Sequence, residues 1–285
     1  MKRYCGRDFS EAEMNLMRTL IAEDANRTRT ELSRQVCQAI HWLKPDGGLK
    51  DMSCRVAMLR MQQDGLIQLP PPRRRPAQTH IHISVETDPQ GAMDFPVHAL
   101  SNLELRLVNA GANSRLWNEF IHRYHYLGYQ PLPGAQLRYW VFAGEQLVAL
   151  ISFGAAAWMC APLDQFIGWN HDQRQKNLHR VVNNARFLIL PWVNSKNLAS
   201  KILGLVAKQL QQDWLCRYGY RPLILETFVE QARFLGTCYR AANWHHVGQT
   251  KGRGKLGPAG KISVPIKDVW LYPLNKKYKS ELICQ

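Results

Sequence analysis

The stretch RFLILPWVNSKNLASKILGLVAKQLQQDWLCRYGYRPLILETF, residues 186–228, decides the fold. Its first apolar run, 186–192, and its last, 221–228, each predict a buried strand. Between these runs apolar residues recur at helical spacing, and Gly219 is expected to end the helix. The apolar positions of this helix are Leu198, Ile202, Leu205, Leu210 and Leu215.

The neighbouring segments extend this pattern in both directions. Downstream, a shorter helix is expected over 230–244, followed by a closing strand and turn over 245–252. The order strand, helix, strand, helix, strand predicts a mixed α/β domain with a central sheet. Upstream, we expect a helix over 113–124 and a hairpin of strands 137–143 and 146–154.

A polar, helix-like segment separates the hairpin from the first strand of the opening stretch. It covers residues 164–185 and contains few apolar positions at regular spacing. We therefore expect the buried strand to begin only at Arg186.

The first 65 residues predict three helices, over 10–25, 28–42 and 49–65. Ser10 and Glu13 form a capping box, Thr30 is a candidate N-cap, and Gly65 is the expected C-terminal glycine. The residues predicted to face inward are Met14, Met17, Leu20 and Ile21 in the first helix, Leu32, Val36 and Ile40 in the second, and Met52, Val56 and Leu59 in the third. A short apolar strand, 66–69, should follow and stop at the prolines.

This order, with a basic tip after the strand, is typical of a winged helix-turn-helix. The third helix would then enter the major groove of DNA, and the tip would contact phosphate. Its candidate DNA contacts are Lys50, Ser53, Arg55, Arg60 and, at the tip, Arg73, Arg74 and Arg75. A partner-binding module is the alternative. We predict a winged-helix-like domain over 1–76, a linker over 77–100, and an α/β domain with a basic C-terminal loop over 101–285.

The net charge of +15 is unevenly distributed. Residues 1–76 hold 14 Lys and Arg against 9 Asp and Glu, residues 77–232 hold 13 against 11, and residues 233–285 hold 10 against 2. Two basic segments that flank a nearly neutral middle favour a polyanion partner, DNA or RNA, over an inert basic protein.

Seven scattered cysteines form no CxxC pair, so neither a disulfide framework nor a zinc ribbon is expected. The sequence has no apolar run long enough for a membrane span, and its first residues are too acidic for a signal peptide. These features predict a cytoplasmic protein with reduced thiols and no membrane partner.

The order of elements in the C-terminal two thirds resembles the GNAT acetyltransferase fold. Tyr239 falls at the position of that family's helical tyrosine, and Trp244 at the aromatic residue after it. The resemblance implies an acyltransferase in which Tyr239 protonates the leaving thiolate. The family holds the coenzyme A pyrophosphate with a glycine-rich turn. The corresponding turn, VNSKNLAS over 193–200, lacks those glycines, which argues against acetyl-CoA as a cofactor.

A more extensive resemblance covers nearly the whole chain. The segments that carry it are residues 32–72, HYLGYQPLPGAQLRYWVFA (125–143), NNARFLILPWV (183–193), ETFVEQARFLGTCYRAANW (226–244) and GQTKGRGK (248–255). They are similar to the DruA family of the Druantia anti-phage system, and similar segments occur in transposase-like proteins of mobile elements. The resemblance implies a bacterial protein of phage defence or mobile DNA, with other defence proteins as partners.

Two residues lead the candidates for catalysis. Tyr239, next to Arg240, could serve as a general acid or as a nucleophile on a phosphodiester; a core aromatic residue is the alternative. Glu226 lies in an apolar strand, where an isolated carboxylate is unfavourable. It is either a base or metal ligand, forming one site with Arg186, or the partner of Arg186 or Arg233 in an ion pair.

Further candidates are Cys238, as a nucleophile or a small core residue, and His125, as a base or ligand. A metal site of the transposase type would need Asp164, Glu226 and Asp268 to converge, which their spacing does not demand. Such an enzyme would use Mg²⁺; the sequence itself assigns no metal ligands.

The basic loop TKGRGKLGPAGK, residues 250–261, suits contact with a nucleic-acid backbone through Lys251, Arg253 and Lys255. It lacks the order of a nucleotide-hydrolysing P-loop.

Three functions remain open from the sequence. The first is a DNA-binding protein of anti-phage defence or mobile DNA that cleaves or rejoins strands. The second is an acyltransferase of GNAT-like fold that acts on nucleic acid or protein. The third is a non-catalytic DNA-binding adaptor of a defence complex.

Overall fold

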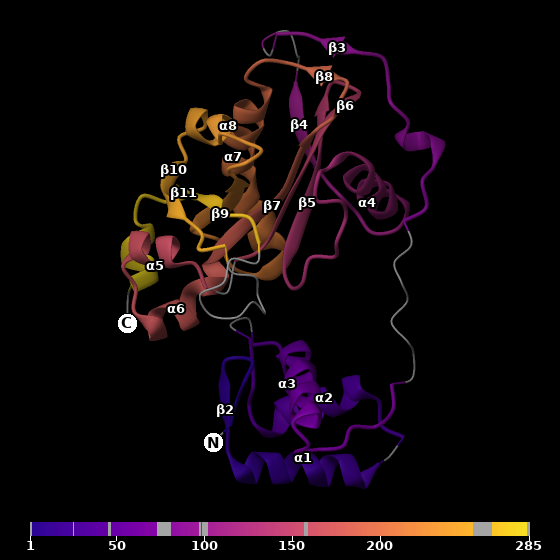
Figure 1. Ribbon diagram of the computed structural model, residues 1–285, viewed down its shortest axis with the longest axis vertical. Coiled ribbons are helices and arrows are strands. Elements are labelled where there is room, and N and C mark those ends of the chain that lie inside the picture. The colour runs from indigo at the N-terminus through magenta and orange to yellow at the C-terminus, as the bar shows by residue number, and fades with distance from the viewer. Residues whose placement is uncertain are drawn as a thin grey trace. The chain divides into compact units, whose positions relative to one another are not determined.

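The computed structural model describes residues 2–24, 26–44, 47–72, 81–96, 98, 102–156, 159–252 and 264–283. The chain forms two compact units, Met1–His80 and Ile81–Gln285 (Figure 1). Five predicted nucleic-acid contacts lie outside the described residues: Arg73, Arg74, Arg75, Arg253 and Lys255.

The first unit contains a small hairpin and three helices. Strands β1 (Lys2–Tyr4) and β2 (Arg7–Phe9) pair antiparallel. Helices α1 (Glu11–Glu23), α2 (Arg29–Ala39) and α3 (Asp51–Gln63) follow. The capping box of Ser10 and Glu13 is confirmed. The second helix also has a capping box, but its N-cap is Thr28 rather than the predicted Thr30, because Thr28 is three residues before Glu31.

The orientation predicted for α3 was wrong. Met52, Val56 and Leu59 are exposed, and the helix instead buries Cys54, Ala57, Met58 and Met61. Apolar residues lie all around this helix, so the sequence pattern does not select one face. The burial of the neighbouring helix α2 does follow the prediction at Leu32 and Val36.

The strand predicted after α3 does not form. Residues 66–72, all of them described, are in no strand, although Ile67 and Leu69 are buried. The amide of Leu69 donates to the side chain of Gln62 instead of a strand partner. The prolines that follow have no amide hydrogen to give to a ladder. The only hairpin among the described residues of this unit is β1–β2, which the sequence analysis missed.

The second unit is built on a seven-stranded mixed sheet of order β10-β11-β9-β7-β6-β5-β4. Its strands are β4 (Leu103–Leu107), β5 (Gln136–Ala143), β6 (Gln146–Ala155), β7 (Val181–Ile189), β9 (Ile224–Glu230), β10 (His245–Gln249) and β11 (Lys267–Pro273). All neighbours pair antiparallel except β7 and β9, which are parallel. The predicted mixed α/β class is confirmed.

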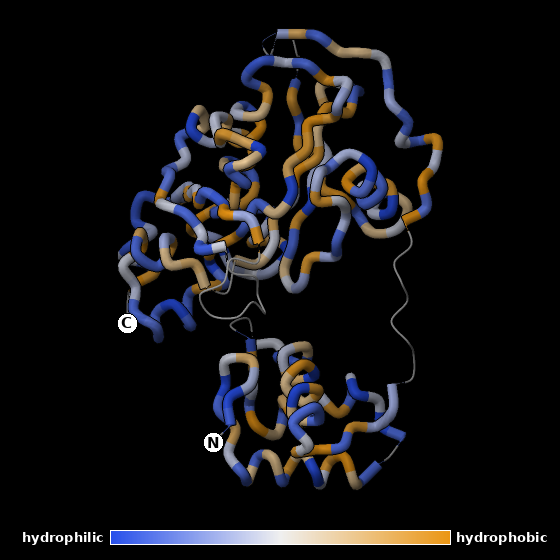
Figure 2. Tube along the Cα trace, in the orientation of Figure 1, coloured by the Kyte–Doolittle hydropathy of each residue, from blue (hydrophilic) through white to orange (hydrophobic). Residues whose placement is uncertain are grey.

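Two long helices cover opposite faces of this sheet (Figure 1). Trp140 of β5 packs edge-on against Phe120 of α4 (Ala112–Tyr124), with ring centres 6.0 Å apart. Its neighbour Tyr139 donates to Asp213 of α7 (Leu198–Tyr218) at 3.0 Å. Adjacent strand residues point to opposite faces, so α4 and α7 enclose the sheet. Figure 2 shows the central strands as largely apolar segments.

Shorter elements complete the second unit. They are η1 (Val85–Thr87), β3 (Met93–Asp94), α5 (Ala161–Ile167), α6 (His171–Asn177), η2 (Leu178–Arg180), β8 (Val193–Asn194), α8 (Thr237–Ala241) and α9 (Tyr278–Ile283). Residues 81–96, which fall in the predicted linker, lie against this unit: β3 pairs with β8, and Thr87 donates to Glu119 of α4. No helix among the described residues is both long and apolar enough to cross a membrane.

Two element boundaries differ from the prediction. Strand β7 begins at Val181 and ends at Ile189, five residues earlier at its start than predicted, because Asn183 and Asn184 belong to the strand despite their polarity. The helix expected over 230–244 shrinks to α8, since Gly236 adopts a left-handed backbone with φ of 67° directly before it.

Candidate functional site

The parallel strands β7 and β9 separate soon after they pair. Their register runs only from Val181 opposite Ile224 to Asn183 opposite Glu226. On the other side of β7, its register with β6 shifts between Ser152 and Phe153, which makes Ala185 the extra residue of a bulge. Open α/β sheets bind ligands beyond the carboxyl ends of parallel strands, so this separation marks the candidate site.

A buried hydrogen-bond network lies at this separation. The Tyr239 hydroxyl donates to Oδ1 of Asn184 at 2.8 Å, and Oγ1 of Thr227 lies 3.5 Å from the same hydroxyl. Asn184 also donates to the backbone oxygen of Ser152 at 3.0 Å. Burial, with Cys238 nearby, raises the pKa of Tyr239. The phenol therefore stays protonated at neutral pH and can give a proton, but it is not a ready nucleophile.

A second group lies beside this network. Nε of Arg186, just past the bulge, donates to the backbone oxygen of Gly128 at 3.3 Å. Burial and the charge of Arg186 lower the pKa of His125 to about 4. The amide of Leu127 donates to Nδ1 of His125 at 3.2 Å, which leaves the ring hydrogen on Nε2. The imidazole is thus neutral at pH 7 and offers a donor to a ligand.

Aromatic and charged residues continue this second group outward. The rings of Tyr126 and Phe234 lie 5.2 Å apart, and the guanidinium of Arg233 lies 5.3 Å from the Tyr126 ring. Arg233 is itself paired with Glu230 at 2.9 Å. Tyr126 and Phe234 are 40% and 48% exposed, an unusual amount for large rings next to a buried polar network.

The free energy of unfolding is expected to fall as the pH drops from 6.5 towards 4. In this window the unfolded chain protonates His125 and the folded chain does not, so stability rises with pH and is fully present above 6.5. One pKa unit corresponds to about 1.4 kcal/mol, and with partial exposure we expect a total loss of roughly 2 kcal/mol. Urea unfolding at stepped pH measures this slope.

His125→Gln should flatten the slope, whereas His122→Gln, an exposed histidine on the preceding helical turn, should preserve it. A slope that survives His125→Gln would belong to other titrating groups.

The structure brings together some of the predicted catalytic residues. Tyr239 and Cys238 both lie on α8. Arg186 and His125 both contact the segment 126–128, and the Tyr126 hydroxyl is one of the groups that raise the pKa of Tyr239. Burial raises the pKa of the Cys238 thiol, which disfavours the thiolate needed for a nucleophile.

Glu226 has different surroundings. It is fully buried within the paired part of β9, one residue before Thr227, and therefore points to the other face of the sheet. Its charge acts on Cys160, at the start of α5, rather than on Tyr239. Arg233, one of its two predicted ion-pair partners, is engaged by Glu230.

The predicted metal ligands do not gather. Asp164 pairs with Arg174 at 3.2 Å, and Asp268 lies 3.0 Å from Nε2 of His246. Across the described parts of the chain, no group of three His, Cys, Asp or Glu side chains could hold a metal ion.

The predicted nucleic-acid contacts differ in accessibility. Arg60 is exposed, whereas Lys50 and Ser53 are half-buried. Arg55 is half-buried and bonded to Asp51 and Thr30. In the second unit Lys251 and Arg240 are exposed, and the Arg240 guanidinium lies 5.9 Å from the ring of Trp270.

Sequence reasoning missed Asn184, Thr227 and Tyr126. The signal for Asn184 was present, since a pair of asparagines followed by an arginine interrupts an otherwise apolar strand, VVNNARFLI. Polar residues inside a buried strand need hydrogen-bond partners, and such networks cluster at functional sites.

Solved structures similar to the chain include a mutant spermidine N-acetyltransferase from Vibrio cholerae, with 14% identity over 62% of this chain and 95% of that chain and a TM-score of 0.39. An N-acetyltransferase from Staphylococcus aureus has 11% identity over 61% and 99% of the two chains, with a TM-score of 0.37. A Bacillus subtilis acetyltransferase in complex with CoA has 8% identity over 61% and 100%, with a TM-score of 0.37.

The family comparison is more direct. No curated protein matches the sequence. The family model described as "Druantia protein DruA" matches residues 61–282, which is well over half of the chain. This span contains every predicted catalytic residue, and the chain belongs to the DruA family.

Proposed function

We propose that the second unit is an acyltransferase in which Tyr239 is the proton donor. The observation that carries this proposal is the position of the Tyr239 hydroxyl, which is held by Asn184 and Thr227 where β7 and β9 separate. Helix α7 connects these parallel strands, so its N-terminus lies at the same end of the sheet as their carboxyl ends. A proton donor and a helix N-terminus thus share one edge.

The residues present support a proton-transfer role. In acyl transfer, an acceptor nitrogen bonds to the acyl carbon and the carbon–sulfur bond of a thioester breaks. The protonated Tyr239 gives its hydrogen to the leaving sulfur, and the proton lost by the acceptor nitrogen restores the phenol. Arg186, two residues after Asn184 on β7, would add positive charge at this edge of the sheet.

Coenzyme A is the group that a GNAT-like fold implies, and it supplies the acyl group as a thioester. The turn before α7 lacks glycine, but Asn197 takes the left-handed conformation there, with φ of 67°. Oγ of Ser195 is buried and has no hydrogen-bond partner among the described residues. With the first-turn amides of α7 and the exposed Lys196 and Lys201, this turn fits a pyrophosphate.

Acetyl-CoA is expected to stabilise the protein against heat. At a concentration 100 times Kd, a ligand adds about 2.7 kcal/mol, which corresponds to a rise in Tm of roughly 5–10 °C. Differential scanning calorimetry with acetyl-CoA and calorimetric titration measure the effect. The double substitution Lys196→Gln and Lys201→Gln should weaken binding about tenfold, because each lysine attracts phosphate at the helix N-terminus.

Lys208→Gln, an exposed lysine two turns further along α7, is the matched control and should bind like wild type. An unchanged Tm at millimolar acetyl-CoA would contradict the cofactor assignment.

Strand cleavage has less support from the geometry. Burial raises the pKa of Tyr239, so this residue presents no phenolate that could attack a phosphodiester. The predicted carboxylates Asp164, Glu226 and Asp268 form no shared group.

Nucleic-acid binding is a second candidate function, favoured by the net charge of +15 and by the exposed Arg60 on α3. Arg60→Gln should weaken binding to duplex DNA and lower the slope of log K against log salt by about 1. Arg34→Gln removes the same charge from an exposed position on α2, and it should weaken DNA binding less than Arg60→Gln does. Fluorescence anisotropy at stepped salt separates the two, and equal effects would contradict a role for α3.

A non-catalytic adaptor is the remaining alternative. It predicts that substitutions at Tyr239 act only through stability.

A further inference from the structure

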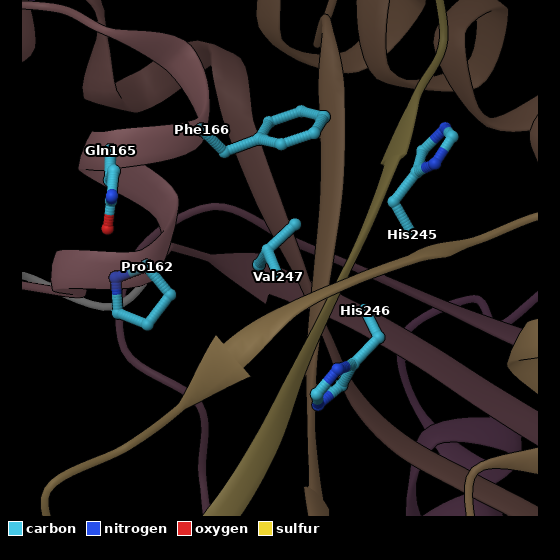
Figure 3. Close-up of a pocket in the computed structure, with 6 residues that line it drawn as sticks. All are labelled: Pro162, Gln165, Phe166, His245, His246 and Val247. Atoms are coloured by element: carbon cyan, nitrogen blue, oxygen red, sulfur yellow. The ribbon is translucent and has the colours of Figure 1, made fainter.

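A pocket of about 380 Å³ lies between α5 and β10 in the second unit. Its lining residues are Pro162, Gln165, Phe166, His245, His246 and Val247 (Figure 3). Three of these side chains are planar rings, and the only amide is that of Gln165. Apolar and aromatic walls with a few polar groups are typical of a site for a small organic ligand.

Three successive residues of β10 are among those that line this pocket, and the strand carries a bulge directly after His246. His246 opposes Trp270, but Gly248 opposes Val269, so Val247 is the extra residue. A regular strand would send neighbouring side chains to opposite faces, and a bulge re-aims them. Figure 3 shows Val247 at the centre of the group, with the α5 residues on one side and the histidines on the other.

The walls of the pocket are held at a fixed spacing. A Cβ added to Gly248 would lie 3.4 Å from Pro162, so a larger residue there would press on α5. The ring of Phe166 stacks on Tyr278 of α9, with centres 5.8 Å apart and planes at 10°. Nε2 of His246 lies 3.0 Å from Oδ1 of Asp268. The ring surfaces are therefore organised before any ligand arrives.

One lysine of the basic C-terminal segment, Lys279, lies beside the pocket. Residues 233–285 hold 10 Lys and Arg against 2 Asp and Glu. Both acidic residues are engaged, Asp268 by His246 and Glu281 by Arg180 at 2.7 Å. Nζ of Lys279 lies 5.6 Å from the centre of the Phe166 ring. Ring surfaces next to surplus cations are the combination that binds unpaired nucleotides.

We propose that this pocket binds a nucleobase whose phosphate is held by Lys279. The rings of Phe166 and His245 provide stacking surfaces, and Gln165 offers both a donor and an acceptor to the edge of the base. Bases of a duplex are stacked and paired, so the ligand is a free nucleotide or an unpaired nucleotide of a single strand. The site does not depend on Tyr239 or on acyl transfer.

Binding measurements on the full chain test this proposal. The probes are AMP and CMP, followed by calorimetry, and a labelled 12-nucleotide single strand and its duplex, followed by anisotropy at constant salt. Phe166→Leu keeps an apolar side chain but removes the ring, and should weaken binding to the single strand or to the nucleotides about tenfold. Phe95→Leu changes a half-exposed phenylalanine outside the pocket and should leave all affinities unchanged.

His245→Ala provides a second variant, since His245 is exposed and its loss should not disturb folding even if Phe166→Leu does. Equal losses for AMP or CMP and for the strand would identify a nucleotide site, and loss for the strand alone would identify a strand-binding site. The proposal is overturned if wild type binds none of these probes. It is also overturned if both variants bind like wild type, or if duplex affinity falls as much as single-strand affinity. Acyl transfer by both variants should stay at the wild-type level, which separates this site from the one at Tyr239.

Discussion

Tyr239→Phe is expected to lower the rate of acyl transfer about 100-fold or more, with the affinity for acyl-CoA unchanged. A positioned general acid typically contributes 10²–10⁴ to a rate, and this substitution removes only the hydroxyl that carries the proton. Because burial raises the pKa of Tyr239, the wild-type enzyme should keep its proton donor across the neutral range. The measurement is kcat from thiolate release, with acetyl-CoA and nucleic-acid or protein acceptors, alongside calorimetric binding of acetyl-CoA.

Tyr139→Phe is the matched control for this experiment. Tyr139 is also a buried tyrosine of the second unit, and its hydroxyl donates to Asp213 rather than to the network at the strand separation. Tyr239→Phe removes the contacts of its hydroxyl with Asn184 and Thr227, and Tyr139→Phe removes the bond to Asp213, so each variant should lose about 1–3 kcal/mol of stability. Only Tyr239→Phe should lose turnover. Equal rates in the two variants would show that the Tyr239 hydroxyl is structural and would favour the adaptor function.

The fold of the second unit was largely predictable because its elements are long and consistently patterned. Helix α7 repeats apolar residues at helical spacing, and β5, β6 and β9 are apolar runs of strand length. Gly219 ends α7 in a left-handed conformation, as its position in the sequence indicates. Strand β11, KDVWLYP, has only a short apolar run at its centre, and α9 has only six residues, so neither element had a comparable signal.

The first unit shows where a sequence pattern becomes ambiguous. In α3 the exposed residues Met52 and Val56 are as apolar as the buried Met58 and Met61. Hydrophobicity alone therefore does not predict which face of α3 is buried, and the packing of α3 against α2 determines it. The predicted wing fails for a different reason, because its strand has no partner and ends in prolines.

The candidate site was predictable only in part. Tyr239 and Arg186 stand out by residue type, and both lie where β7 and β9 separate. Their partner Asn184 was hidden by a misplaced strand boundary, because two asparagines look like a loop in sequence. The bulge at Ala185 depends on pairing with β6, a contact that no local pattern reveals.

Gly236→Ala is expected to destabilise the second unit by about 3 kcal/mol. A Cβ at this position would lie 2.8 Å from Cζ2 and 2.9 Å from Nε1 of Trp270, whose side chain is buried. Forcing atoms into a packed interior costs roughly 1–3 kcal/mol, and the left-handed backbone of Gly236 adds about 1 kcal/mol for any residue with a Cβ. Urea unfolding, followed by the fluorescence of the tryptophans, measures the loss.

Gly144→Ala separates these two contributions. Gly144 has a φ of 59° in the turn between β5 and β6, and an added Cβ there meets nothing within 4 Å. Gly144→Ala should lower the free energy of unfolding only by the backbone contribution, about 1 kcal/mol. Equal losses at the two glycines would mean that the Trp270 side chain moves aside at no cost in free energy. Gly236 is also the N-cap of the helix that carries Tyr239, so any shift of α8 away from Trp270 moves the proposed proton donor. Gly236→Ala should therefore reduce acyl transfer even at temperatures where it is fully folded, whereas Gly144→Ala should not.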